Sequence, residues 1–208
     1  MKNPKKTART NQERREETRQ ALLAAARKLF AKQGYAATST PEIVKAAGLT
    51  RGALYYHFTD KRDVFRAVLE SEQSAIMTKI ESRTGRRGKD PVDALVRGSR
   101  AFLEAAADPA TMRIVFIDGP AVLGRQEWLE VDRRYAAGSL RAGLEAAMAA
   151  GAVKKLPLDP LADVMSAAFN EAALVLREPG AEATVEGLVD VFRALFDGLR
   201  VRGKRKRS

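Results

Sequence analysis

The residues with the clearest chemistry lie around position 51 of the chain. Arg51 carries a guanidinium group that can donate two parallel hydrogen bonds to guanine, and Ala53 is small enough to touch a thymine methyl group. Gly52 lets its backbone approach a surface closely. Lys45 supplies a further positive charge for phosphate. Such residue types are typical of a segment that enters a groove of double-stranded DNA.

The surrounding spacing predicts two short helices joined by one tight turn. Thr40 is a suitable N-cap for the first helix, and Gly48 can end it with a positive φ. Thr50 is placed to cap the second helix, which buries Leu54 and Phe58 at positions i and i+4. This arrangement leaves a largely polar set outside the core: Arg51, Gly52, Ala53, Tyr55, Tyr56 and His57. The predicted DNA-binding residues are this set together with Thr40, Lys45, Thr50 and Lys61.

A Thr-capped helix, an Ala-Gly-Leu turn and the run Leu-Tyr-Tyr-His-Phe followed by Lys61 resemble the N-terminal pattern of the TetR family of bacterial transcriptional repressors. The resemblance covers roughly residues 14 to 65. It implies phosphate contacts for four residues, Thr40, Tyr55, His57 and Lys61, and a backbone or base contact for Tyr56. The alternatives are that the aromatic rings pack in the core and that Arg51 is a solvated surface charge.

Composition excludes several other classes of protein. The chain has 208 residues, 45% hydrophobic and 30% charged, as in soluble globular proteins. It has no cysteine and one histidine, which excludes disulfides, thiolate metal sites and multi-histidine zinc sites. We therefore expect no metal and no cofactor. Without a long apolar run or a signal peptide, we expect a cytoplasmic protein with no membrane partner.

Positive charge is concentrated at two places. Residues 1–70 contain fifteen Lys or Arg against seven Asp or Glu, a net charge of +8, and residues 199–208 contain six against none, a net charge of +6. The stretch between them has sixteen against nineteen, a net charge of −3. The distribution is expected if one end of the molecule approaches a polyanion, although a generally basic surface is the plain alternative.

We predict an all-α fold with an N-terminal three-helix, helix-turn-helix DNA-binding domain and a C-terminal helical domain for ligand binding and dimerisation. The predicted boundaries are a basic arm (1–13), the DNA-binding domain (14–65), the second domain (66–201) and a basic tail (202–208). In the first domain, a helix begins between residues 11 and 14 and stops at Gly34, and a longer helix starts at Lys61. The second domain is predicted to contain helices at 91–107, 109–117, 125–150, 160–177 and 184–201. Residues 112–117 have strand-like composition, but no nearby run could pair with them.

The helices predicted at residues 160–177 and 184–201 each have an apolar face, and these two faces are candidates for a dimer interface. Small residues at 168 and 172 would permit close helix packing, and the resemblance implies a symmetric four-helix arrangement. An intramolecular core explains the two faces equally well. The predicted interface residues are Leu161, Val164, Ala168, Ala172, Val175, Leu188, Phe192, Leu195, Phe196 and Leu199.

Large side chains interrupted by isolated polar ones predict a ligand pocket in the same domain. The alternative is that these side chains simply fill the core. The predicted pocket residues are Phe102, Met112, Arg113, Phe116, Asp118, Trp128, Tyr135, Met165, Phe169 and Asn170.

These features predict a ligand-responsive homodimeric repressor that binds a near-palindromic DNA operator and is released by a small, largely apolar effector of unknown identity. A constitutive DNA-binding factor without an effector remains an alternative. A more remote alternative is an α-helical enzyme that uses Asp118, Glu171 or Tyr135. Because the sequence lacks paired carboxylates, a nucleophile motif and a phosphate loop, we predict that the protein is not an enzyme.

Overall fold

The computed structural model describes residues 10–85, 90–177 and 183–201. The chain divides into two compact units, Met1–Val68 (unit 1) and Leu69–Ser208 (unit 2). Most of the predicted basic arm (residues 1–9) and the basic tail (202–208) lie outside the described residues.

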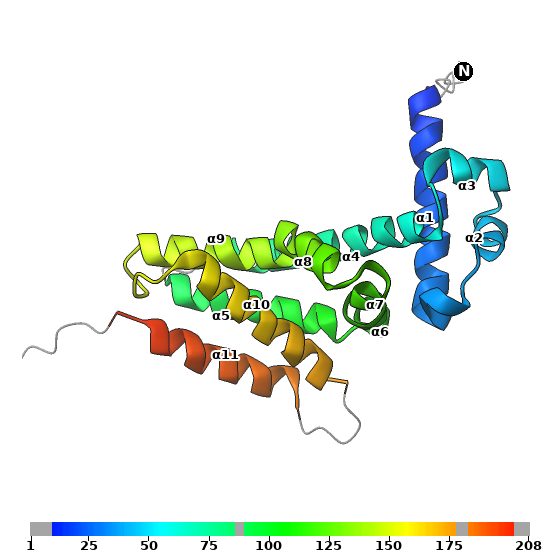
Figure 1. The fold of residues 1–208 in the computed structure, drawn as a ribbon. Helices are drawn as coiled ribbons and strands as arrows, with labels where there is room; N and C mark the ends of the chain where they lie inside the picture. Colours follow the sequence, from blue (N-terminus) through cyan, green and yellow to red (C-terminus); the bar gives the residue numbers. More distant parts are fainter. Residues whose placement is uncertain (1–9, 86–89, 178–182, 202–208) are drawn as a thin grey trace, which may run out of the picture. The chain divides into compact units, whose positions relative to one another are not determined.

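Helices account for nearly all of the described chain (Figure 1). They are α1 (Asn11–Ala37), α2 (Thr40–Ala47), α3 (Arg51–His57), α4 (Lys61–Thr84), α5 (Pro91–Ala106), α6 (Pro109–Thr111), the π-helix η1 (Met112–Asp118), α7 (Gly119–Leu123), α8 (Arg125–Arg134), α9 (Ala136–Ala149), α10 (Leu158–Val175) and α11 (Val185–Leu199). The described residues contain no strand, and an isolated antiparallel bridge joins Val153 to Arg200. The all-α prediction is confirmed.

Unit 1 is held together by a small core shared by its helices. Phe30 of α1, Ile43 of α2, Leu54 of α3 and Phe65 of α4 are all fully buried. The rings of Phe30 and Phe65 meet edge to face at 5.3 Å between centroids, a favourable aromatic geometry. Each of the four helices therefore contributes a buried side chain to the core, and this packing holds the helices together across their short connections.

Two helix ends in unit 1 differ in detail from the prediction. Ser39, rather than Thr40, is the N-cap of α2, because its Oγ accepts a hydrogen bond from the Glu42 backbone N–H while the Glu42 carboxylate accepts one from the Ser39 N–H. Thr40 is the first helical residue. Gly34 does interrupt α1, with φ 83° and ψ 169°, but one further turn to Ala37 follows it.

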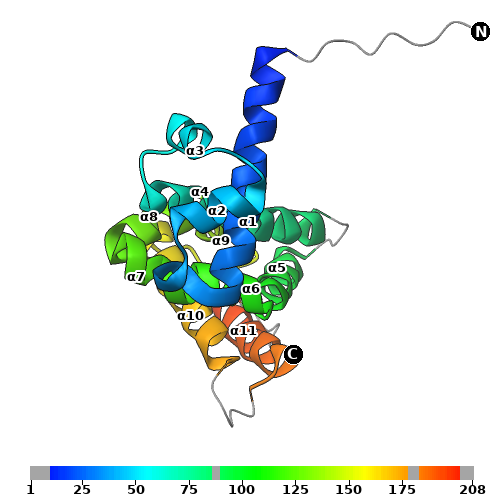
Figure 2. The ribbon, with the colours of Figure 1, turned by 90° about the vertical axis from the view of Figure 1, so that its right-hand side faces the viewer.

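Unit 2 is built around α5, which is buried along most of its length. Helix α11 lies beside α5, as Figures 1 and 2 show, and α9 and α10 also pack against it. A cluster of rings joins these helices: Phe102 of α5 contacts Phe169 of α10 edge to face, and Phe169 stacks on Phe192 of α11 at 3.7 Å between centroids. The core of the unit is thus formed from helices distant in sequence.

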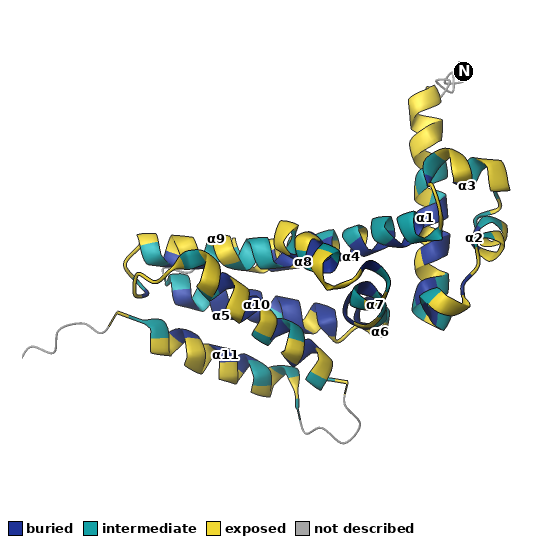
Figure 3. Ribbon diagram, viewed as in Figure 1, coloured by how far each residue is buried: buried dark blue, intermediate teal, exposed yellow. Residues whose placement is uncertain are grey.

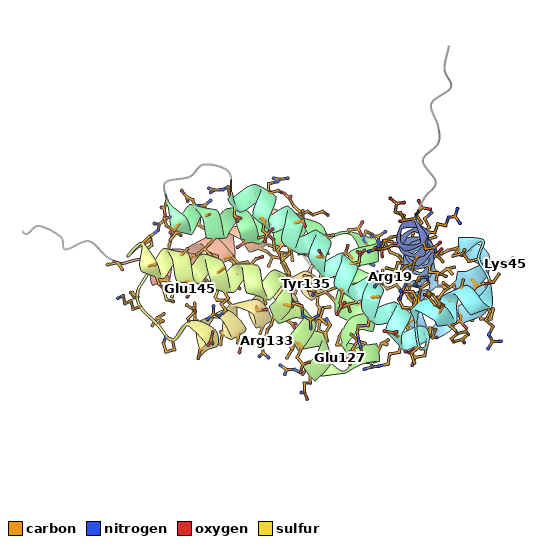
Figure 4. All side chains as sticks on the ribbon, turned by 90° about the horizontal axis from the view of Figure 1, so that it is seen from above. Arg19, Lys45, Glu127, Arg133, Tyr135 and Glu145 are labelled. Atoms are coloured by element: carbon orange, nitrogen blue, oxygen red, sulfur yellow. The ribbon has the colours of Figure 1, made fainter. Side chains whose placement is uncertain are left out.

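Two predictions about the middle of unit 2 need correction. The segment that resembled a strand is helical, as predicted, but residues 112–118 adopt a π-helix, a form found mostly as a single turn inside other helices. The single helix predicted for 125–150 is wrong. It breaks at Tyr135 (φ −117°, ψ −101°; Figure 4), and the break brings the Arg133 carbonyl so close that a Cβ at Gly138 would lie 2.7 Å from its oxygen.

Within the ranges that the structure describes, no helix has the length and apolar content needed to cross a membrane.

Candidate functional site

Helix α3 has one buried face and one face available to a ligand. Gly48 turns the chain with φ 66°, and the Thr50 Oγ1 accepts a hydrogen bond from the Ala53 N–H at 3.2 Å, as predicted. Leu54 is fully buried, and Tyr56 is 65% exposed. Arg51 and Gly52 are also exposed. The predicted helix-turn-helix geometry is present, with its polar face outward.

Tyr55 connects α2 and α3 through their side chains. The neighbouring Thr40 hydroxyl and Arg51 guanidinium lower the pKa of Tyr55 below its ordinary value. The Arg51 guanidinium also lies 5.5 Å from the centre of the Tyr55 ring, within the range of a cation–π contact. Tyr55 therefore holds Arg51 near the start of α3, and its 44% exposure does not fit the core-packing alternative.

Two arginines of α1, which the sequence analysis did not single out, extend this surface. The Arg15 guanidinium lies 5.0 Å from the centre of the Tyr56 ring, and that of Arg19 lies 5.5 Å from the centre of the Phe58 ring. Their spacing of four residues on one helix face was a visible signal. Together with Lys45, which is exposed on α2 (Figure 4), they add positive charge to unit 1.

Burial lowers the pKa of His57, and the nearby charges of Arg15 and Arg19 lower it further. At neutral pH this imidazole is therefore mostly uncharged. Because His57 is only partly buried, it is compatible with both roles that the sequence suggested, which are packing in the core and contact with a phosphate.

If His57 contacts a phosphate, binding of DNA should raise its pKa, since a nearby anion favours the protonated form. We expect His57 to titrate below 6.5 in the free protein and at higher pH in the complex, so that DNA affinity increases as pH falls through that interval. Because the chain has one histidine, an NMR titration of the full chain follows it without ambiguity. An unchanged midpoint in the complex would remove His57 from the set of phosphate contacts.

Lys61 has a structural role that the sequence did not suggest. Its Nζ donates to the carbonyl oxygens of Tyr35 at 2.9 Å and Thr38 at 2.8 Å, and lies 4.1 Å from the centre of the Tyr35 ring. An ammonium has three donors, so one remains for a phosphate. The phosphate contact of Lys61 stays a prediction, but this side chain also joins the C-terminal end of α1 to the start of α4.

Unit 2 contains an apolar cavity of about 360 Å³ bounded mainly by α4, α5, α9 and α10. This volume lies in the range of small-molecule sites. Its lining residues are Ile80, Glu81, Thr84, Pro91, Ala94, Leu95, Gly98, Ser99, Phe102, Asp132, Ala136, Ala137, Ser139, Leu140, Ala142, Gly143, Ala146, Ser166 and Phe169.

Asp132 is the most unusual group in the cavity wall, because it is 1% exposed. Its Oδ1 accepts from the Gln73 Nε2 at 3.3 Å, and its Oδ2 accepts from the Ser166 Oγ at 3.0 Å and the Asn170 Nδ2 at 3.3 Å. Burial raises the pKa of Asp132, although these three donors oppose the shift. Asp132 was not among the residues predicted from the sequence, yet its position four residues after Trp128 places an acid on the apolar face of α8.

Both units resemble one family of proteins. Residues 22–68 match the family model described as bacterial regulatory proteins of the tetR family, and residues 92–199 match the model of the tetracyclin repressor-like C-terminal domain. The second match alone covers more than half of the chain. The chain belongs to the TetR family. It thus belongs to a family of bacterial regulatory proteins and has that family's helix-turn-helix domain, and the predicted family is confirmed.

Individual relatives agree with this assignment. A TetR-family transcriptional regulator from Pectobacterium atrosepticum has a similar solved structure, with a TM-score of 0.77, 32% identity, and coverage of 94% of this chain and 100% of that one. The HTH-type transcriptional regulator AcrR of Shigella flexneri is 49% identical over 69 residues, which are 33% of this chain and 32% of that protein. The A-factor receptor protein of Streptomyces griseus is 27% identical over 86% of this chain and 62% of its own length. The chain therefore covers about a third of AcrR and less than two thirds of the A-factor receptor.

The ten predicted pocket residues of this TetR-family chain fall into three groups. Phe102 and Phe169 line the cavity, and Asn170 reaches it through Asp132. Four others, Met112, Phe116, Trp128 and Met165, are core residues of unit 2, none more than 9% exposed. Arg113, Asp118 and Tyr135 are half-buried and lie outside the described cavity lining. For most of the large side chains, therefore, the core-filling alternative holds.

The predicted interface residues divide in a similar way. Phe192 and Phe196 are 2% and 0% exposed and Ala172 is also buried, so these three belong to the core of unit 2. By contrast, Val164 is 68% exposed on α10 and Leu195 is 47% exposed on α11. The other predicted residues are half-buried: Leu161, Ala168, Val175, Leu188 and Leu199. Figure 3 shows exposed residues along α11, and a partner could cover only this outer face.

Proposed function

We propose that this protein is a homodimeric repressor that binds a near-palindromic operator through α3 and leaves it when a small, largely apolar molecule enters the cavity of unit 2. The single observation that carries the proposal is helix α4. It begins in unit 1 at Lys61, and its last turns supply Ile80, Glu81 and Thr84 to the cavity. A ligand that binds better to one arrangement of α4 than to another would therefore alter operator affinity.

Two further features support this function. The outward set on α3 combines a guanidinium with a small residue and a glycine, which suits contacts with bases in the major groove. The partly exposed apolar residues of α10 and α11 suit a two-fold interface, and two copies of α3 would then read two half-sites. The cavity favours a ligand-responsive protein over a constitutive DNA-binding factor.

The test begins by selecting DNA that binds the full chain from a random-sequence library, which should yield near-palindromes. Arg51→Ala should then lose about 1 to 3 kcal/mol on the selected DNA and relax the preference at one base position in each half-site. Lys45→Ala is the matched control, since it removes one positive charge from the neighbouring helix and should weaken selected and random DNA similarly. Competition binding at one fixed salt concentration measures both variants.

Equal losses on selected and random DNA for both variants would remove Arg51 from base recognition. Selection of DNA without two-fold symmetry would contradict the proposed dimeric repressor.

A further inference from the structure

The cavity of unit 2 has a one-sided charge. Its walls are mostly apolar, with Leu95, Phe102, Leu140 and Phe169 among the larger side chains. Two acidic residues are part of the lining, the buried Asp132 and the solvent-exposed Glu81. None of the described residues that line it is a lysine, an arginine or a histidine. The lining therefore offers a charged ligand acidic groups and no basic group.

Asp132 is held by neutral donors only. Its three described hydrogen bonds come from two amides and one hydroxyl, and Arg133 next to it pairs with Asp163 instead. A carboxylate can accept about four hydrogen bonds, so this residue of the cavity wall can accept a further one. Burying a carboxylate without a cation is costly. A cationic donor inside the cavity would relieve that cost.

We infer that Asp132 recognises the ammonium group of an amine-bearing apolar molecule, whose hydrocarbon or aromatic body occupies the space beside Phe102 and Phe169. The inference rests on the proposed function, since it names the chemical class of the effector. The volume is enough for roughly a dozen water molecules, which suits one ring and a short chain. Carboxylates and phosphates are disfavoured, because they would lose their hydration beside the buried acid Asp132 with no basic group in the lining to pair with them.

The same contact offers a link to α4. The hydrogen bond from the Gln73 Nε2 to Asp132 is long at 3.3 Å, and the buried Gln73 Oε1 has no hydrogen-bond partner. Gln73 belongs to α4. An ammonium at Asp132 would compete with the Gln73 amide for Oδ1, so the ligand should alter a bond that holds α4 in its unliganded position.

The probes are three compounds with the same body and different end groups: 4-phenylbutylamine, 4-phenylbutan-1-ol and 4-phenylbutyrate. Calorimetric titration of the full chain should show the amine binding about 10 to 150 times more tightly than the carboxylate, with the alcohol between them, since hydrogen bonds to charged groups contribute about 1.5 to 3 kcal/mol. Only bound probes should raise the melting temperature. The amine should also weaken binding to the selected operator.

Asp132→Asn should abolish the preference for the amine while leaving alcohol binding within a few-fold. Asp190→Asn is the matched control, because Asp190 is an exposed acid of α11 outside the cavity lining, and it should leave all three affinities unchanged. A third variant, Leu140→Trp, should block amine binding by filling the cavity. Circular dichroism verifies that each variant is folded.

Three outcomes would overturn the inference: no amine binding at millimolar concentration, carboxylate binding as tight as amine binding, or unchanged amine binding by Leu140→Trp. If Asp132→Asn does not fold, the ratio of amine to carboxylate affinity in the unaltered chain decides. Failure here leaves operator selection and its dependence on Arg51 intact, so the proposed function can survive. Selection of DNA without two-fold symmetry would instead contradict the proposed function.

Discussion

Aspartate at both Val164 and Leu195 is expected to convert the proposed dimer into monomers and to lower operator affinity by about 100-fold or more. Both side chains are apolar and exposed, at 68% and 47%. An aspartate at either position would have to lose its hydration when two subunits associate, and this costs free energy. In a two-fold interface every substitution occurs twice, so the cost is doubled. Loss of the second subunit removes the gain from binding two half-sites together, which is typically 100-fold to 10,000-fold. Sedimentation velocity and operator titration measure the two effects.

Two comparison variants make this result specific. Ala149→Asp changes an exposed residue at the end of α9 and should leave both the dimer and the operator affinity unchanged. Phe192→Asp should instead unfold unit 2, because its ring is 2% exposed and stacks on Phe169. If the double variant is folded and still dimeric, the outer face of α10 and α11 is not the interface.

The contrast between Phe192 and Leu195 shows the limit of the sequence pattern. Both lie on the apolar stripe of α11, three residues apart, and a stripe contains no information about what covers it. Phe192 faces the ring of Phe169 in the same subunit, whereas Leu195 is partly open to solvent. Phe192 is buried and Leu195 is exposed because of where α5 and α10 lie against α11. Their positions depend on contacts between distant parts of the chain.

The helix-turn-helix, in contrast, could be predicted almost residue by residue. Its signals act within one or two turns: a hydroxyl that caps, a glycine with positive φ, and apolar residues at i and i+4. Thr50, Gly48 and Leu54 fulfil these roles in the structure. The N-cap is Ser39 and not Thr40. Both residues carry a hydroxyl group that can cap a helix, so N-cap propensity alone does not distinguish them.

Asp132 and Lys61 could not be assigned from local pattern, because their partners are remote. Asp132 bonds Gln73 and Ser166, which are 59 and 34 residues away. Lys61 bonds the carbonyls of residues 26 and 23 positions earlier. The resemblance to the TetR family implies a DNA contact for Lys61, and the structure adds hydrogen bonds to backbone carbonyls within unit 1. Side chains with several donors can serve both purposes, so motif position does not exclude a structural role.

Trp128→Ala is expected to lower the free energy of unfolding by about 3 to 5 kcal/mol, the usual cost of truncating a large buried aromatic side chain. The sequence suggested a ligand contact, but the ring is 9% exposed and its Nε1 donates to the Val115 carbonyl oxygen at 2.8 Å. Val115 lies in the π-helix η1. The ring also packs on Gly119, where an added Cβ would lie 2.9 Å from the Trp128 Cδ1.

The loss should therefore have two separable parts. Trp128→Phe keeps most of the ring and removes the donor, and it should cost about 0.5 to 1.5 kcal/mol through the lost hydrogen bond to the Val115 carbonyl oxygen. Since a domain has only about 5 to 15 kcal/mol of stability in total, the alanine variant should also show weaker operator binding whenever unit 2 is partly unfolded. Urea unfolding of both variants, followed by circular dichroism, measures the difference. A stable Trp128→Ala protein that had lost only its response to amines would return Trp128 to the ligand site and contradict its place in the core.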